Sequence, residues 1–202
     1  MTDYEFSSDW FSHHIDFWTK VFRSAGWNAN EEKTVVEIGS FEGRSTVWSC
    51  RNLLLHPSSR IFCVDTFAGS VEHSESLKAD LFSRFRHNVA TAGIAEKVEV
   101  RRGESWQELC KLIAEGVRAD VIYIDGSHQA PDVLEDACLS FRLLRHGGLM
   151  MFDDYHWTIE RHGAEDILNS PKLAVDMFFN IYRRKVKLFA QSAHQIVLQK
   201  TL

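Results

Sequence analysis

Acidic residues or glycine turns follow each of five apolar segments in this sequence. The acids are Glu37, Asp65, Asp125, Asp153 and Asp154. Carboxylates can attract an ammonium group, accept the hydroxyls of a ribose, hold a divalent cation or take up a proton. Which of these tasks they perform depends on whether the preceding segments bring them to one place.

The loop GSFEGRS (39–45) lies between the first apolar segment and a helix-like stretch. A helix N-terminus offers free backbone N–H groups and a partial positive charge, so it can hold an anion. The spacing from Gly39 to Gly43 is neither the dinucleotide fingerprint GxGxxG nor a Walker P-loop. Glu37, just before the loop, would repel a phosphate and attract an ammonium group. This combination, with Ser40 and Ser45 in the loop, favours a zwitterion such as the amino-acid end of S-adenosylmethionine.

Asp65 and Thr66 follow the second apolar segment, at about the position where nucleoside-binding folds place an acid that accepts ribose hydroxyls. After the third segment, Gly103 allows a ligand to approach the backbone, Ser105 can hydrogen-bond adenine and Trp106 can cover its face. Two plainer roles stay open: Asp65 can cap a turn, and Ser105 can cap the helix that it begins.

The acids after the fourth and fifth segments predict a cation site. If these two strands are neighbours, about 4.8 Å apart, then Asp125, Asp153 and Asp154 converge on one small volume. Unpaired carboxylates repel, and a hard divalent ion such as Mg²⁺ resolves the conflict. The alternative is that one aspartate caps a helix and another holds the ammonium group of a cofactor. His128, on the turn after Asp125, can accept the proton of a hydroxyl group.

Five strand-like segments alternate with amphipathic helical ones, which is typical of a mainly parallel sheet with βαβ crossovers. The predicted strands are 34–38, 60–64, 97–101, 120–124 and 148–152. The predicted helices are 9–24, 43–55, 78–92, 105–116, 131–145 and 159–180. In such a sheet ligands bind beyond the carboxyl ends of the strands, so the residues named above fall on the expected binding edge.

Two further strand-like segments, 185–190 and 195–199, are joined by a short polar link and predict an antiparallel hairpin. We therefore expect a three-layer, Rossmann-like α/β fold with five parallel strands followed by that hairpin. No linker or repeat divides the chain, so residues 1–202 are expected to form one domain, with 1–30 as an N-terminal helical extension.

Composition excludes several classes of protein. With 23 basic and 28 acidic side chains, the net charge of −5 argues against a nucleic-acid partner. Four scattered cysteines lack metal-type spacing. The acidic, aromatic N-terminus is unlike a signal peptide, and no segment approaches the roughly 18 apolar residues of a membrane span. We expect a cytoplasmic protein with a small-molecule partner and no membrane partner; a homo-oligomer is left open, since the aromatic N-terminal helix can pack on a second subunit.

The ordered segments VVEIGSFEGRST, FCVDTF, RGESWQ, VIYIDGSH and LLRHGGLMMFDDY resemble those of class I S-adenosylmethionine-dependent methyltransferases. Within that class they are similar to the metal-assisted O-methyltransferases of the catechol and caffeoyl-CoA type, and most to the methyltransferase 24 group. The resemblance covers residues 33–157 and implies a seven-stranded sheet. It also implies that Glu37 and Ser45 contact the methionine end of the cofactor, Asp65 its ribose, and Ser105 and Trp106 its adenine.

The resemblance assigns the metal to Asp125, Asp153 and Asp154, and places His128 where catechol-type enzymes carry a lysine base. The expected activity is methyl transfer from S-adenosylmethionine to a hydroxyl oxygen of a small molecule, assisted by a divalent metal such as Mg²⁺. Two alternatives are a non-catalytic S-adenosylmethionine-binding module and an NAD-dependent oxidoreductase. The residues do not identify the methyl acceptor, whose pocket we expect the loops 66–78 and 155–159 to shape.

Overall fold

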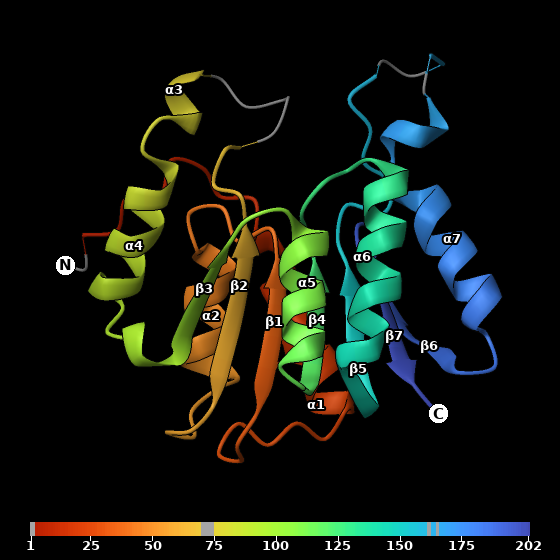
Figure 1. Ribbon diagram of the computed structural model, residues 1–202, viewed down its shortest axis with the longest axis horizontal. Helices are drawn as coiled ribbons and strands as arrows, with labels where there is room; N and C mark the ends of the chain where they lie inside the picture. Colours follow the sequence, from red (N-terminus) through yellow and green to blue (C-terminus); the bar gives the residue numbers. More distant parts are fainter. Residues whose placement is uncertain (1–2, 70–74, 161–162, 165) are drawn as a thin grey trace.

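The computed structural model describes residues 3–69, 75–160, 163–164 and 166–202. Its core is a seven-stranded sheet with the order β3-β2-β1-β4-β5-β7-β6 (Figure 1). Strands β1 to β5 are parallel, whereas β7 is antiparallel to both β5 and β6. This arrangement confirms the predicted α/β fold with its C-terminal antiparallel hairpin.

The strands are short and mostly buried. They are β1 (Thr34–Ile38), β2 (Arg60–Asp65), β3 (Val98–Arg102), β4 (Ala119–Ile124), β5 (Leu144–Phe152), β6 (Val186–Gln191) and β7 (Ile196–Lys200). The α-helices are α1 (Ile15–Ser24), α2 (Arg44–Asn52), α3 (Glu75–Lys78), α4 (Leu81–Thr91), α5 (Ser105–Ala114), α6 (Ala130–Leu143) and α7 (Pro171–Tyr182). Three 3₁₀ turns complete the elements: η1 (Ser12–His14), η2 (Ala95–Lys97) and η3 (Ile167–Asn169).

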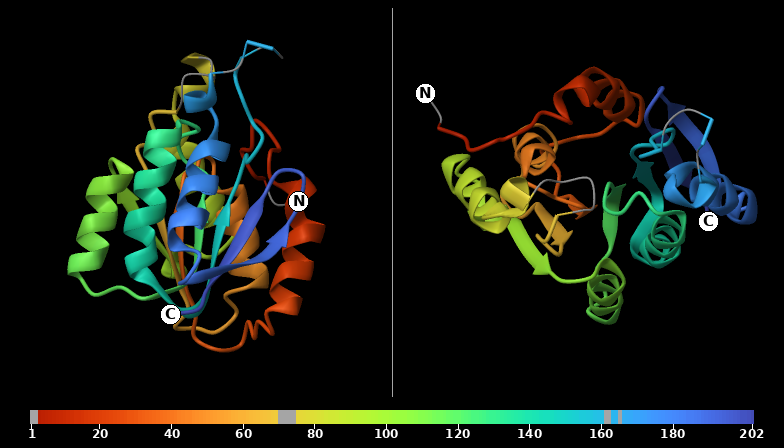
Figure 2. Two further views of the ribbon diagram at one scale, coloured as in Figure 1. Left: turned by 90° about the vertical axis from the view of Figure 1, so that its right-hand side faces the viewer. Right: turned by 90° about the horizontal axis from the view of Figure 1, so that it is seen from above.

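The helices cover both faces of the sheet (Figure 2). Successive strand residues point to opposite faces, so Val35 packs with α1, α2 and α4, while its neighbour Val36 packs with α5, α6 and α7. Because both faces are buried, the inner parallel strands β1, β2 and β4 are mainly apolar along their length, whereas the edge strand β3 alternates valine with charged residues and is only partly buried. Two helix predictions need correction. In the predicted helix 9–24, residues 9–11 are not helical and precede η1. The helix predicted to begin at residue 159 begins only at Pro171, whose fixed φ suits the first helical position.

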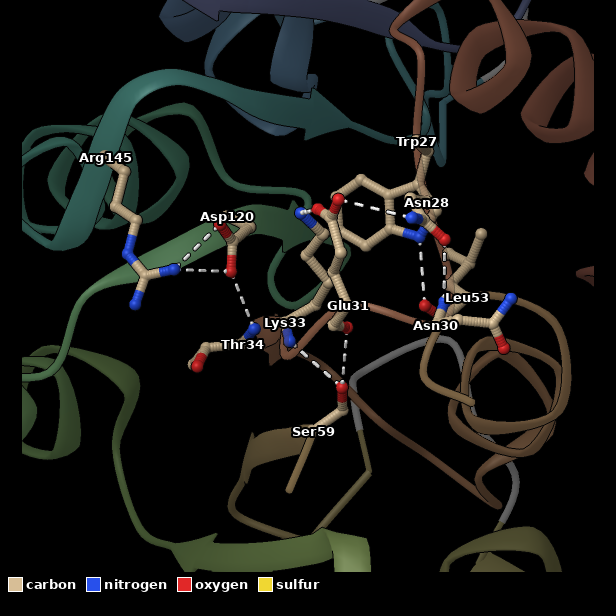
Figure 3. Close-up of polar contacts among 10 residues, drawn as sticks. All are labelled: Trp27, Asn28, Asn30, Glu31, Lys33, Thr34, Leu53, Ser59, Asp120 and Arg145. Carbon is tan, nitrogen blue, oxygen red and sulfur yellow. Dashed lines mark hydrogen bonds and ion pairs between the residues drawn. The ribbon is translucent and has the colours of Figure 1, made fainter. Parts of the chain in front are cut away.

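Polar contacts hold the strands together at the end where β1 begins (Figure 3). Asp120 accepts the Thr34 N–H at 2.8 Å and pairs with both oxygens to Arg145 Nη1, at 2.8 and 2.9 Å. The Lys33 N–H donates to the Ser59 hydroxyl at 2.9 Å. These contacts fix the alignment of β1 with β4 and β2. They lie at the opposite end of the strands from the predicted binding residues.

At the end where the predicted binding residues lie, backbone hydrogen bonds continue beyond the strands. Gly39 N donates to Val64 O at 2.9 Å, and Asp125 N donates to Ile38 O at 2.8 Å. Asp153 N donates to Ile124 O at 3.0 Å, and Gly103 N to Asp65 O at 3.1 Å. The carboxyl ends of five strands are therefore fastened side by side. Within the described part of the chain, no helix has the length and apolar character needed to cross a bilayer.

Candidate active site

Gly39 lies where the end of β1 touches the end of β4. Its backbone is left-handed, with φ of +84°, and a Cβ added there would lie 1.9 Å from the Asp125 carbonyl oxygen. Only glycine adopts this conformation with no steric penalty, and only glycine permits so close an approach. Gly43, with φ of +81°, turns the chain into α2. The loop expected from the sequence is therefore present, and both glycines adopt the left-handed conformation that its turns require.

Asp65 holds this loop in place from the end of β2. Its Oδ2 accepts the N–H groups of Ser40 and Phe41, both at 2.8 Å, and its Oδ1 accepts the Phe67 N–H at 2.6 Å. The N–H groups of Ser40 and Phe41 are therefore already hydrogen-bonded, although the sequence had suggested that the N–H groups of this loop bind an anion. The carboxylate nevertheless stands between the loop and the end of β3, which is where a bound ribose was expected. Thr66 accepts the Ala68 N–H at 3.2 Å.

Glu37 is sealed beneath the loop, with 1% of its surface exposed. Thr46 on α2 donates a short hydrogen bond to its carboxylate, and Cys63 Sγ lies 3.6 Å from the same oxygen. Burial raises the pKa of Glu37, against the effect of these hydrogen bonds. The residue fastens β1 to the first turn of α2, and Ser45 lies above it, 8% exposed.

The end of β3 carries the residues expected to meet adenine. Ser105 begins α5 and is half-buried, while Trp106 is 47% exposed. A Cβ on Gly103 would approach Glu108 Oε1 to 2.9 Å. Beneath Ser105, the buried carboxyl group of Asp136 on α6 leaves its Oδ1 without a hydrogen-bond partner among the residues that the structure describes. Burial raises the pKa of Asp136 to about 7, against a hydrogen bond from Ser105.

Two of the three predicted metal-binding acids share one phenol. The Tyr123 hydroxyl lies 2.9 Å from Asp125 Oδ2 and makes a short hydrogen bond with Asp153 Oδ2. A phenol has one hydrogen to donate, so the second contact requires a proton on a carboxyl group. Burial, followed by the charges of Asp153 and Asp154, raises the pKa of Asp125 well above its ordinary range. Burial and the charge of Asp154 raise the pKa of Asp153 to about 6. The expected crowding of carboxylates is therefore real.

Asp154 faces the other way, toward the rim. Its Oδ2 lies 2.9 Å from His128 Nε2, and the imidazole ring packs against Trp157 at 4.1 Å between centroids. Asp154 has a φ of +52°, a left-handed conformation that is uncommon for an aspartate. Ligand atoms of Asp125, His128 and Asp154 all lie within 4.8 Å of one another. In the part of the chain that the structure describes, this is the group able to hold a metal ion, and Asp153 stands outside it.

Asp153 belongs instead to a buried network that the sequence analysis missed. Gln195, the residue just before β7, donates to Asp153 Oδ2 at 2.8 Å and accepts the Trp18 indole N–H at 2.9 Å. His14 Nε2 lies 3.4 Å from Asp153 Oδ1. Burial and the neighbouring histidines lower the pKa of His14 to about 4. Tyr123 could have been found, because alternate residues on a strand share a face with Asp125; no sequence signal indicates Gln195.

A cavity of about 60 Å³ opens beside the glycine loop. Its wall combines loop residues with Asp125 and with four residues from the N-terminal segment. The full lining is Phe6, Ser8, Trp10, Phe11, Gly39, Ser40, Phe41, Glu42, Arg44, Ser45 and Asp125. The structure thus brings Gly39, Ser40, Ser45 and Asp125 to one cleft. The N-terminal part of its wall includes Trp10 and Phe11, which the residue pattern had assigned to a helix.

A family model for the methyltransferase domain matches residues 36–155, which is more than half of the chain. The chain belongs to the methyltransferase-domain family. The match begins in β1 and ends just after Asp154, so it includes the glycine loop and the whole acidic edge described above. It confirms the family resemblance inferred from the sequence motifs.

Other proteins are similar to this chain in sequence or in fold. The chain is 26% identical over 125 residues to uncharacterized protein R132 of Acanthamoeba polyphaga mimivirus, a match that covers 62% of this chain and about half (52%) of that protein. The structure of a Bacillus cereus O-methyltransferase in complex with SAH superposes with a TM-score of 0.69 at 20% identity, covering 96% of this chain and 84% of that one. TomG, an O-methyltransferase of Streptomyces achromogenes, gives 0.65 at 19% identity, with coverages of 94% and 86%. At these identities the structural likeness establishes the fold.

Proposed function

We propose that this methyltransferase moves a methyl group from S-adenosylmethionine to a hydroxyl oxygen of a small molecule. The observation that carries the proposal is the His128–Asp154 pair, at 2.9 Å, on the rim beside Asp125. Binding of a nucleoside alone needs no such pair. The solved O-methyltransferases of similar fold include one in complex with SAH and one with S-adenosylmethionine, which supports the choice of cofactor.

In this reaction the methyl group passes directly between the two bound molecules, and the protein forms no covalent bond. The acceptor oxygen attacks the methyl carbon, the carbon–sulfur bond breaks and its electron pair returns to sulfur, leaving S-adenosylhomocysteine. The protein has to align the two molecules and remove the hydroxyl proton. In this proposal the imidazole of His128 accepts that proton, and the Asp154 carboxylate orients the ring and stabilises its positive charge.

The donor set at the rim also fits a divalent metal. Asp125, His128 and Asp154 would hold it, and a bound ion would lower the pKa of the acceptor hydroxyl. One imidazole nitrogen beside carboxylate oxygens suits Mn²⁺ or Zn²⁺ as well as Mg²⁺. Asp153, which we expected to be a ligand, would instead support the site from the buried side through Tyr123. His128 cannot ligate the ion and accept the proton at once, so the two roles make different predictions.

An assay of methyl transfer to a panel of catechols and other hydroxylated compounds tests the proposal. If His128 is the base, kcat/KM falls in acid, where a protonated imidazole cannot take up the hydroxyl proton, and His128→Gln lowers the rate and removes that dependence. If the metal is needed, EDTA abolishes turnover, added Mn²⁺ or Mg²⁺ restores it, and Asp154→Ala prevents the restoration. Unchanged turnover in His128→Gln and in EDTA would refute both roles. Tight cofactor binding without methyl release would favour a binding module instead.

A further inference from the structure

The N-terminal residues 5–11, here called the strap, run from beside α4 toward the start of α1 (Figure 2). Asn88 on α4 accepts the Glu5 N–H at 2.7 Å and donates to the Glu5 carbonyl at 3.2 Å. The Ser7 N–H and hydroxyl both donate to the Glu42 carboxylate, at 2.7 and 2.6 Å. Glu42 is only 1% exposed. Hydrogen bonds to a buried charge therefore anchor the strap against the glycine loop.

Arg44, the first residue of α2, lies beneath the strap. Its Nη2 donates to the Ser8 carbonyl at 3.1 Å, and its Nη1 lies 3.5 Å from Asp9. The guanidinium also covers the ring of Phe6, at 4.1 Å from the centroid. Its remaining donor, Nε, is buried and has no hydrogen-bond partner among the described residues. The strap thus positions the guanidinium without using all of its donors.

A second donor lies in the wall of the same cavity. Ser40 is 2% exposed, and its hydroxyl has no partner of hydrogen-bond geometry in the described chain, although its nearness to Glu37 acts to lower the pKa of that acid. A buried donor without a partner costs free energy, which a ligand acceptor can recover. The backbone cannot play that part, because Asp65 already takes the N–H groups of Ser40 and Phe41.

The following inference rests on the proposed function. We propose that Arg44 and Ser40 bind the carboxylate at the amino-acid end of S-adenosylmethionine, and that the strap closes over this carboxylate. The cavity that both residues line also contains Asp125, whose carboxylate can accept a hydrogen bond from the ammonium group of the same ligand. Arginine suits this task because its planar guanidinium remains charged and matches a carboxylate. Since the two donors are sealed from solvent, the strap has to lift for the ligand to enter and leave.

Two ligands that share the nucleoside and thioether distinguish this role from a structural one. S-adenosylhomocysteine carries the amino-acid group, whereas 5′-methylthioadenosine lacks it. In calorimetric titrations, Arg44→Gln should weaken binding of S-adenosylhomocysteine by about 10- to 100-fold and leave 5′-methylthioadenosine within about twofold of the unsubstituted protein. Arg44→Lys, which keeps the charge, should weaken binding of S-adenosylhomocysteine, but less than Arg44→Gln does. Ser40→Ala should show the same selectivity with a smaller loss, and it retains the backbone bond to Asp65.

Arg23→Gln is the control, because it removes one positive charge from the exposed face of α1. It should change neither affinity. Equal loss of both ligands in Arg44→Gln and Ser40→Ala would overturn the inference, since it would indicate a general disturbance of the cleft. Unchanged affinity for S-adenosylhomocysteine in both variants would also overturn it. Failure of the unsubstituted protein to bind either ligand would refute the proposed function itself, a result separate from any effect of Arg44.

Discussion

Replacing Gly39 by alanine adds one methyl group at the point where β1 and β4 meet. The new Cβ would lie 1.9 Å from the Asp125 carbonyl oxygen and 2.5 Å from its carbonyl carbon, and both atoms belong to the backbone. Backbone atoms cannot rotate away as the end of a long side chain can. The substitution should therefore push the glycine loop and the Asp125 turn apart, and these two segments form the floor of the proposed cofactor cleft.

A matched control separates this clash from the effect of backbone conformation. Gly116 has a similar left-handed φ of +76°, and an added Cβ there would meet no atom of the described residues within 4 Å. At either position alanine loses about 1–2 kcal/mol because of the left-handed backbone. At Gly39 the forced displacement should add about 1–3 kcal/mol, as overpacking does elsewhere. The free energy of unfolding should therefore fall by about 2–5 kcal/mol in Gly39→Ala and by about 1–2 kcal/mol in Gly116→Ala.

Urea unfolding of the two variants, followed by circular dichroism, measures the difference directly. Gly39→Ala should also lose affinity for S-adenosylhomocysteine under conditions where it is fully folded, while Gly116→Ala should bind normally. If Gly39→Ala were no less stable than Gly116→Ala, the close approach of the two strand ends would be wrong.

Three further predictions concern stability. The pKa of Asp136 is raised to about 7 in the folded protein, so its ionisation favours unfolding as the pH rises from about 4 to 7; the stability gained by Asp136→Asn should grow over that range and level off above it. Gln195→Ala leaves buried partners unpaired and should cost about 2–4 kcal/mol in urea unfolding; a loss below 1 kcal/mol would contradict the network. Asp120→Ala should cost about 1–3 kcal/mol because the partly buried Thr34 N–H loses its acceptor, and Arg145→Ala less than about 1 kcal/mol because the pair is partly exposed.

The central strands were predictable because burial on both faces produces continuous apolar runs, such as residues 121–124 in β4 and 149–152 in β5. The predicted and observed bounds of β1 agree, and β2 extends one residue beyond the predicted segment, to Asp65. β5 begins earlier than expected, at Leu144, since its first residues are polar or glycine and carry no apolar signal. Element type followed from local pattern, whereas element ends depended on pairing with neighbouring strands.

The missed features depend on contacts between distant segments. The aromatic residues at 10 and 11 suggested the start of a helix, yet they belong to a strap held by Glu42 and Arg44. Asp153 and Asp154 are adjacent in sequence, but the positive φ of Asp154 directs its side chain toward His128, whereas Asp153 stays buried. Residues 70–74, in the loop that we expected to shape the acceptor pocket, lie outside the described residues.

The central claim is that the carboxyl ends of β1, β2, β4 and β5 form one cleft for S-adenosylmethionine. Isothermal titration with S-adenosylhomocysteine tests it most directly. We predict one binding site per chain, retained in Gly116→Ala and lost in Gly39→Ala. A folded, unsubstituted protein that takes up no S-adenosylhomocysteine would contradict the claim.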